Sequence, residues 1–211
     1  MLRPLLIIAF ISVFNIAGAQ NINDDFKIDI TASDTFEGTN LLINIRKRAD
    51  SIKIIYKLRD SINYKGMFKD KRYNELSKYM AYPLNIKTGR DSMRMIDHEL
   101  DSINEKYTHY SIDSLLISTH FMPLYTKLLD EVVLTNTDSL ENKKKNVDRH
   151  VMDGVDFYFD IKIGDAERTL QAQSPNQDSH PILYQLLEQT LDVYRKTKVN
   201  MFLSRGRTDH Y

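Results

Sequence analysis

Residues 153–173 read DGVDFYFDIKIGDAERTLQAQ, and their pattern decides the fold class. Apolar side chains occupy every second position from Val155 to Ile163, and mostly polar side chains lie between them. A period of two is typical of a β-strand that has one buried face and one solvent-facing side. The pair Gly164-Asp165 suits a two-residue hairpin turn, after which residues 168–173 supply the returning strand. The stretch therefore predicts an antiparallel hairpin in the C-terminal part of the chain.

Three earlier segments show the same alternation of apolar and polar residues. They run from Phe26 to Ile30, from Leu41 to Ile45 and from Ile52 to Leu58. The polar stretch 47–51 lies between the second and third segments, so it predicts a second antiparallel hairpin with a loop of about five residues. We therefore expect the fold to begin with a meander of three strands.

A helical spacing of apolar residues replaces this alternation between about residues 68 and 134. A short helix is expected first, followed by the most regular helix over residues 91–107, where apolar side chains recur every three or four positions. A third helix is predicted to begin at Ser111 and to break near Pro123. Residues 135–150 lack an apolar period, so they predict a mobile surface linker.

The last helix is expected to begin near Pro181, whose missing amide hydrogen costs nothing in a first turn. Asp178 or Ser179 is placed to cap this turn. The apolar stripe of residues 182–194 is broad enough to cover a sheet, and its spacing continues to Leu203.

The order of these elements predicts the fold class. Three N-terminal strands, a central helical block, a C-terminal hairpin and a last helix are typical of an α+β protein with a mainly antiparallel sheet. The long C-terminal helix is expected to pack on that sheet. About 190 residues follow Ala19, enough for one ordinary core, so a single domain is expected over residues 20–211.

The first residues have the three parts of a secretory signal peptide. Arg3 supplies the positive charge, residues 5–14 form the apolar segment, and residues 17–19 (AGA) provide the small side chains of a cleavage site. We expect residues 1–19 to be removed, so that the mature chain begins at Gln20 and is exported to the periplasm or secreted. An uncleaved membrane anchor is the alternative, but a spanning helix needs about 20 apolar residues and this run is shorter. No stable membrane span is therefore expected after cleavage.

The composition excludes several kinds of chemistry. The chain contains no cysteine, so it has no disulfides, no thiolate nucleophile and no cysteine ligand for a metal. Its 29 basic residues balance its 29 acidic residues, so no long-range field would concentrate nucleic acid, which is not an expected partner. The glycines are not spaced for a phosphate cradle or a dinucleotide turn, and no cofactor is expected.

Local motifs give little sign of a metal site or an active site. His98-Glu99 would begin a zinc-protease motif, but Ser102 stands where the second histidine is required. The histidines are widely separated in the sequence, so they would form a metal site only if the fold brought them together, and no metal is expected. Asp156 and Asp160 share a strand face but lie about 13 Å apart, which is too far for a glycosidase pair.

Two places remain candidate binding sites. Ser179 and His180 lie at the expected start of the last helix, where free backbone amides could hold an anion beside the imidazole. Helix capping is the competing interpretation and the more common use of such residues. Tyr158 lies on the polar side of its strand, and it is the candidate for an interaction surface.

These observations favour an exported, non-catalytic protein of the cell envelope that binds or assembles with an envelope or extracellular protein. A sheet edge or the tyrosine-bearing surface is expected to contact this partner. The alternative is a metal-independent hydrolase whose Asp, Glu or His residues are dispersed in the sequence and brought together by the fold. We prefer the non-catalytic interpretation because the chain lacks a local nucleophile motif, a phosphate cradle and a metal-binding pattern.

Overall fold

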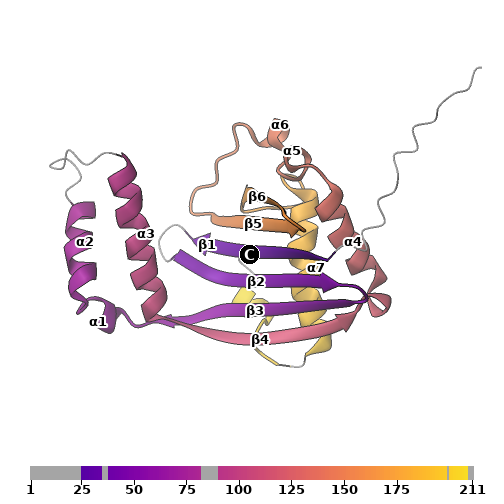
Figure 1. The fold of residues 1–211 in the computed structure, drawn as a ribbon, viewed down its shortest axis with the longest axis horizontal. Coiled ribbons are helices and arrows are strands. Elements are labelled where there is room, and N and C mark those ends of the chain that lie inside the picture. Colours follow the sequence, from indigo (N-terminus) through magenta and orange to yellow (C-terminus); the bar gives the residue numbers. More distant parts are fainter. Residues whose placement is uncertain (1–24, 35–37, 82–89, 199, 209–211) are drawn as a thin grey trace, which may run out of the picture.

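The computed structural model describes residues 25–34, 38–81, 90–198 and 200–208. Within them the chain has an α+β fold, as the order of its elements predicts (Figure 1). The expected signal peptide, residues 1–19, lies outside the described residues. No helix in the described part is long and apolar enough to cross a membrane.

Within the described residues, six strands form one antiparallel sheet with the order β4-β3-β2-β1-β5-β6. The strands are β1 (Phe26–Asp34), β2 (Gly38–Arg48), β3 (Ser51–Ile62), β4 (Thr108–Ser118), β5 (Val155–Ile163) and β6 (Ala166–Gln173). The N-terminal meander and the C-terminal hairpin are both confirmed. They join because β1 pairs with β5, which puts the first strand inside the sheet.

Two of the connections between strands are tight turns. Gly164 and Asp165 connect β5 to β6, as predicted, and Gly164 has a φ of 56°, a backbone conformation that favours glycine. Ala49 and Asp50 connect β2 to β3, so the prediction of a five-residue loop is wrong and both strands are longer than expected. A two-residue turn leaves little freedom in the register of its hairpin.

The segment after helix α3 (Arg90–Tyr107) is a strand rather than the predicted third helix. β4 pairs with β3 and forms one edge of the sheet. The helix prediction was wrong because Ile112, Leu115 and Leu116 have the spacing of a helical face. In the strand, Leu115 points into the core and is 4% exposed, whereas Ile112 and Leu116 are 60% and 74% exposed on the other face. An edge strand with apolar residues on both faces therefore has a helix-like period.

The helices form two groups. At one end of the sheet α1 (Tyr64–Met67), α2 (Lys71–Ala81) and α3 surround a small core of Met67, Leu76 and Ile103 (Figure 1). The second group follows β4, and it contains the 3-10 helix η2 (Thr119–Phe121), α4 (Pro123–Leu134), α5 (Thr137–Leu140), α6 (Lys143–Asn146), α7 (Pro181–Thr197) and α8 (Arg205–Thr208). The predicted break near Pro123 is the start of α4, where proline is well accommodated.

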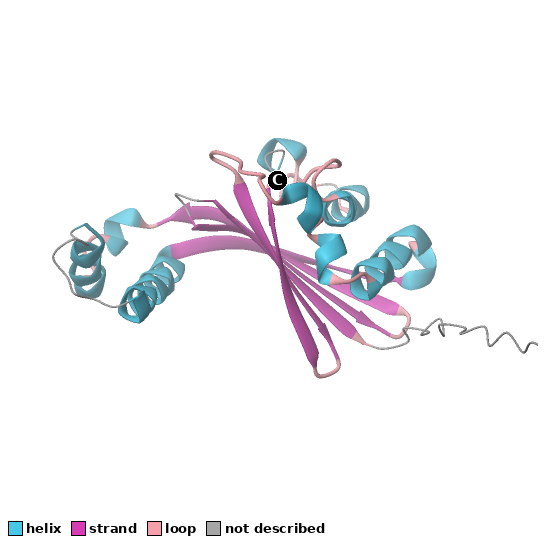
Figure 2. Cartoon of the chain, turned by 90° about the horizontal axis from the view of Figure 1, so that it is seen from above, coloured by secondary structure: helices cyan, strands magenta, loops and turns pink. Residues whose placement is uncertain are grey.

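The main core lies between one face of the sheet and the helices α4 and α7 (Figure 2). Ile30 and Phe159 from the strands and Leu187 from α7 are almost fully buried there. Burying a side chain of this size stabilises the fold by roughly 1.5–3 kcal/mol. The hydroxyl of Tyr56 on β3 donates to the backbone carbonyl of Thr190 on α7 at 2.8 Å, which fixes the helix on the sheet. The expected packing of the C-terminal helix on the sheet is thus confirmed.

The other face of the sheet, which we call the open face, carries the mostly polar residues of the strand alternation. No described helix covers its central part (Figure 2). The open face comprises Lys27, Asp29 and Thr31 on β1, Leu42, Asn44 and Arg46 on β2, Lys53, Ile55 and Lys57 on β3, Ile112, Ser114 and Leu116 on β4, Tyr158, Asp160 and Lys162 on β5, and Glu167, Thr169 and Gln171 on β6. This face therefore presents polar and charged side chains to a partner.

Two expectations about the C-terminal half differ from the structure. Helix α7 ends at Thr197, and the chain is extended at Lys198, so the helix does not continue to Leu203. Leu203 is instead buried in the main core. The segment 135–150, expected as a linker, contains the short helices α5 and α6, and Leu140 within it is buried. These residues therefore form part of the folded unit.

Candidate functional site

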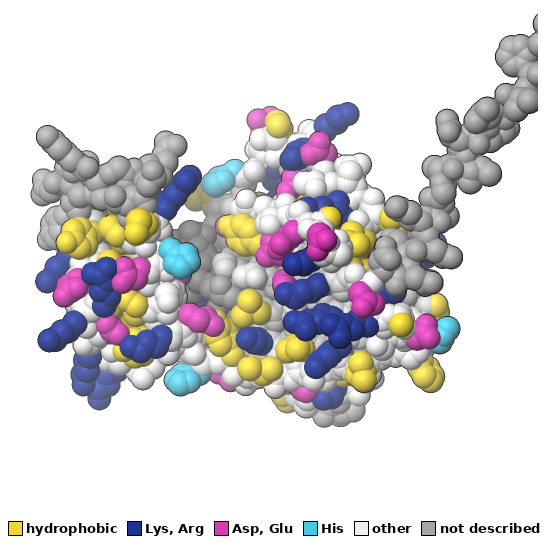
Figure 3. Space-filling model, in the orientation of Figure 1, with side chains coloured by type: hydrophobic (Ala, Val, Ile, Leu, Met, Phe, Trp, Pro, Cys, Tyr) yellow, Lys and Arg dark blue, Asp and Glu magenta, His cyan; other side chains and the backbone are white. Residues whose placement is uncertain are grey.

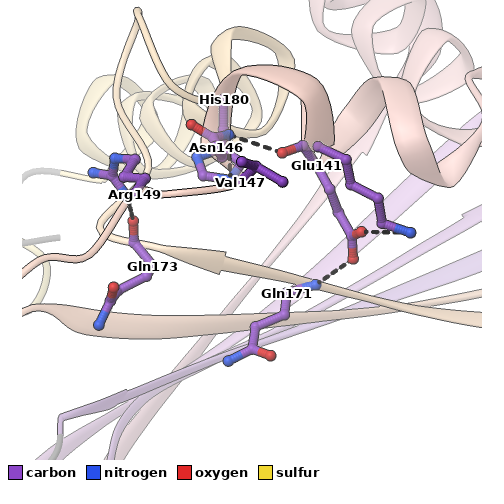
Figure 4. A pocket seen from close by; sticks show the side chains of 8 residues that line it. Glu141, Asn146, Val147, Arg149, Gln171, Gln173 and His180 are labelled. Atoms are coloured by element: carbon purple, nitrogen blue, oxygen red, sulfur yellow. Dashed lines mark hydrogen bonds and ion pairs between the residues drawn. The ribbon is translucent and has the colours of Figure 1, made fainter.

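The first candidate, Ser179-His180, lies immediately before α7 (Figure 4). A depression of about 430 Å³ opens beside His180. Glu141 after α5, Asn146 at the end of α6 and Arg149 also line it. The fold thus brings together residues that are far apart in the sequence, including one imidazole, one carboxylate and one guanidinium.

His180 is held as a neutral group by its neighbours. Its Nδ1 lies 3.0 Å from the Ser179 hydroxyl oxygen, and its Nε2 lies 3.2 Å from the side-chain nitrogen of Asn146. That nitrogen also donates to the backbone carbonyls of Glu141 and Ser179, each at 2.9 Å, which fixes the amide orientation. The Asn146 amide has two hydrogens for these three neighbours, so its contact with Nε2 is at most a shared hydrogen bond. Burial lowers the pKa of His180, the charge of Arg149 lowers it further, and Glu141 opposes this shift.

The turn before α7 is closed by Asn176 rather than by the predicted caps. The side-chain oxygen of Asn176 accepts from the backbone amides of Asp178 at 3.0 Å and Ser179 at 2.8 Å. The Ser179 hydroxyl accepts from the backbone amide of Asn176 at 3.1 Å. No side chain caps α7, so capping by Asp178 or Ser179 is wrong, whereas Pro181 in the first turn is confirmed.

The geometry of Ser179 and His180 supports a structural role. Both residues are buried, and the Ser179 carbonyl also accepts from the side chain of Asn142 at 2.9 Å. Arg149 donates to the backbone carbonyls after β6, including that of Ser174 at 2.8 Å. These bonds tie the segment around α6 to the loop before α7. The polar atoms of Ser179 and His180 already have hydrogen-bond partners within the protein, which leaves little capacity to bind an anion. An anion site at these two residues stays a prediction.

The second candidate, Tyr158, lies on the open face and is 37% exposed. Its register partners are Thr31 on β1 and Gln171 on β6. The Gln171 side chain lies 3.5 Å from the Tyr158 hydroxyl, which is a weak hydrogen bond at most. Tyr158 is therefore available at the surface, and it shares the open face with a larger pattern of charges.

Four cationic side chains cross the open face in one line, which we call the basic row: Lys162, Lys27, Arg46 and Lys53. Lys27 is the register partner of both Lys162 and Arg46, and Arg46 is the partner of Lys53. Neighbouring strands lie about 4.8 Å apart, so the basic row extends over roughly 14 Å. Like charges directly opposite each other destabilise a sheet. Sheet stability alone therefore does not explain this arrangement.

Nearby acidic residues neutralise the basic row only in part. Lys27 forms an ion pair with Asp29 on the same strand, but Arg46, Lys53 and Lys162 form no ion pair with any described residue. A depression of about 360 Å³ at this end of the sheet is lined by Lys27, Arg46, Lys47, Arg48 and Lys162, among others. Figure 3 shows lysine and arginine side chains gathered over the same part of the open face. The local surface is thus basic although the whole chain is neutral.

The structure also brings together a pair of carboxylates. Asp29 on β1 and Asp160 on β5 are register partners on the open face, and with Asn44 they line a depression of about 440 Å³. Asp29 accepts a hydrogen bond from the Asn44 side chain and pairs with Lys27, and Asp160 accepts from the Thr169 hydroxyl at 2.6 Å. Each carboxylate therefore has its own partners, and the pair is part of a mixed network of charges.

Sequence reasoning missed both the basic row and the carboxylate pair. Both depend on the register between β1 and β5, two strands that are far apart in the sequence. No local pattern indicates which distant strands pair or in which register. Within the described part of the chain, no group of three or more His, Asp or Glu side chains is placed to hold a metal ion.

No known protein family, curated protein or solved structure matches this chain. The geometry of the described residues is therefore the basis for assigning a function. Of the two candidates, the open face has cations that form no ion pair with a described residue, whereas the surroundings of His180 are closed by internal hydrogen bonds.

Proposed function

We propose that the protein is an exported, non-catalytic binding or assembly protein of the cell envelope, and that its open face contacts an acidic segment of a protein partner. The single observation that carries this proposal is the basic row, in which Arg46, Lys53 and Lys162 have no ion pair among the described residues. An acidic partner would relieve the repulsion within the row. Binding of an acidic partner would therefore explain why the chain keeps a row of like charges that weakens the isolated sheet.

The neighbours of the basic row favour a protein over a simple anion. Leu42 and Ile55 line the adjoining depression and are only half-buried, and Tyr158 is exposed on the same face. Protein interfaces combine such apolar and aromatic contacts with charged groups at their rim. A partner strand or loop that alternates acidic and apolar residues would match both features.

Short peptides of defined charge can test this proposal. A fluorescent peptide of alternating Glu and Leu should bind more tightly than one of Glu and Ser, and a peptide of Lys and Leu should not bind. Fluorescence anisotropy gives the three dissociation constants. Two exposed ion pairs contribute about 0.4–2 kcal/mol together, so Arg46→Gln with Lys53→Gln should weaken binding about two- to thirtyfold.

The matched control replaces two exposed lysines of α2, Lys71→Gln and Lys78→Gln, which removes the same charge far from the open face. This control should bind as tightly as the unchanged protein. Equal weakening by both double variants would show that only net charge matters, and it would contradict a site on the open face. Binding of the Lys-Leu peptide would contradict it as well.

A metal-independent hydrolase is the second candidate, and the register pair Asp29 and Asp160 is the observation that favours it. Hydrolysis of glycosides uses two carboxylates about 5–9.5 Å apart, a range that cross-strand partners can reach. The two carboxylates are already engaged by their neighbours, which makes this the weaker candidate. Asp29→Asn and Asp160→Asn should each reduce the turnover of chromogenic glycosides about a hundredfold or more in a hydrolase. A binding protein has no turnover to lose.

Export can be tested on its own. The intact mass of the protein recovered from its native cells should correspond to a chain that begins at Gln20. Recovery from the periplasm or the medium should accompany this mass. A mass that retains Met1 would contradict export, but it would leave the argument for the open face unchanged.

A further inference from the structure

The edge strand β4 offers a long, regular backbone to a partner. Ser111 to Ser118 pair with Leu58 to Ser51 of β3 in an unbroken register. On its other side β4 has no strand neighbour in the described part of the chain, because it ends the sheet. An unpaired strand of this length presents a row of free N–H and C=O groups.

The other edge strand, β6, is protected. The carboxylate of Glu141 accepts from the backbone amide of Gln171 at 3.0 Å, which occupies an edge position. Strand β6 also carries the charged residues Glu167 and Arg168. Charged side chains and covering segments are the usual means by which proteins keep strand edges from pairing. One edge amide of β4 is bound in the same way, because the Ser114 amide donates to the Asp113 carboxylate at 2.7 Å. The two edges therefore differ in their exposed side chains rather than in this contact.

Strand β4 carries fewer charged side chains than β6. It contains no lysine, arginine or proline, and its one acidic residue, Asp113, is held by Lys198 at 2.8 Å and by Tyr194 within the same molecule. Its open-face residues Ile112 and Leu116 are 60% and 74% exposed. Apart from Ser114, the open-face side of this stretch is therefore apolar, and it carries no charge.

We propose that β4 pairs antiparallel with β4 of a second copy of this chain, about a two-fold axis at Ser114. In this register Ser114 faces its own counterpart, so its amide exchanges the Asp113 carboxylate for a backbone carbonyl of the other copy. Ile112 of each copy faces Leu116 of the other. Asp113 faces Leu115, so no like charges oppose each other. A two-fold contact requires such a self-complementary surface, and the sequence of β4 provides it on both sides of Ser114.

This contact would join the two sheets into one, with both open faces on the same side. An axis perpendicular to the sheet relates two antiparallel strands without exchanging their faces. The two basic rows would then lie on one extended surface. The contact between the two copies involves only β4, so it is independent of the proposed ligand.

Sedimentation velocity over a range of concentrations tests the contact. The unchanged protein should show a monomer–dimer equilibrium. Ile112→Lys with Leu116→Lys places lysines opposite each other twice, and it should weaken the dimer roughly ten- to thirtyfold. Ile112→Glu with Leu116→Lys places opposite charges at the same two positions, and it should restore the dimer relative to the double-lysine variant.

The comparison of these two variants separates pairing between copies from a general effect of charge. Both remove the same apolar side chains, which are largely exposed, so circular dichroism should show the same fold for both. Met95→Lys, at a residue of α3 that is 73% exposed, is the control and should leave the dimer unchanged. A protein that is monomeric at all concentrations, or equal weakening in both β4 variants, would overturn the proposal.

Discussion

Arg168 connects the sheet to the end of helix α4, and its removal should destabilise the fold measurably. From β6, its guanidinium donates to the backbone carbonyl of Thr135 at 2.6 Å and to those of Val132 and Val133 at 2.8 and 3.0 Å. The last carbonyls of a helix have no partner within the helix, so a side chain or water must satisfy them. Arg168 supplies these hydrogen bonds together with a positive charge at the negative end of the helix dipole.

The expected effect of Arg168→Met follows from these contacts. A hydrogen bond to a charged group contributes about 1.5–3 kcal/mol, and a cation at a partly buried helix C-terminus up to about 2 kcal/mol. Burial of the guanidinium opposes these gains, as the lowered pKa of Arg168 indicates. We therefore expect a net loss of about 2–3 kcal/mol in the free energy of unfolding. Arg168→Lys keeps the charge but loses the forked geometry, so it should cost about half as much.

Urea unfolding followed by circular dichroism gives the free energies for this comparison. Lys127→Met is the matched control, because Lys127 is an exposed cation of the same helix with no ion pair among the described residues. It should change the stability by less than about 0.5 kcal/mol. A change within that same limit for Arg168→Met, or an Arg168→Lys variant as stable as the unchanged protein, would contradict the role of Arg168 at the end of α4.

Three further predictions concern buried or paired polar groups. The lowered pKa of His180 means that stability falls as the pH drops below about 6.5, by up to about 1.4 kcal/mol per unit, because the unfolded state binds the proton more readily. Urea unfolding of His180→Gln between pH ~5 and ~7 should lack this component, and an unchanged slope would exclude it. Lys198 is the main cause that lowers the pKa of Asp113 to about 2, so this carboxylate stabilises the fold above pH ~4 and loses its effect toward pH ~2. Asp113→Asn should therefore cost about 1 kcal/mol at neutral pH after solvent screening and almost nothing near pH ~2, and a cost independent of pH would contradict this. Tyr125→Phe removes the 3.0 Å contact with the Thr190 hydroxyl and should cost about 1 kcal/mol in urea unfolding, whereas equal or greater stability would show that the contact contributes nothing.

Most strands could be predicted because each has one apolar and one polar side. Phe157 and Phe159 are buried while Tyr158 between them is exposed, so the alternation in the sequence reports directly on burial. β4 breaks this rule. Ile112 and Leu116 are apolar but face solvent, which produced a helical spacing, and only the pairing with β3 reveals the strand.

The functional surface was harder to predict than the fold. The interpretation of Tyr158 as a surface residue rested on a local pattern, and the structure places it on the open face. The basic row instead depends on contacts between distant strands, as Lys27 and Lys162 show. The neutral net charge of the chain gave no sign of the basic row, because the positive charges gathered on the open face are balanced by acidic residues elsewhere. The start of α7 was misjudged because Asn176, two residues before Asp178, closes its turn.

The position of β1 inside the sheet has a consequence for the order of folding. The second neighbour of β1 is β5, so the strand pairs completely only after more than half of the chain has been synthesised. Helix α7, which covers these strands, is synthesised later still. Tyr56 on β3 can form its hydrogen bond to Thr190 of α7 only then. Closing such long loops is slow compared with local contacts. A nascent chain with this topology therefore completes its sheet and its core only when almost all of the chain is available.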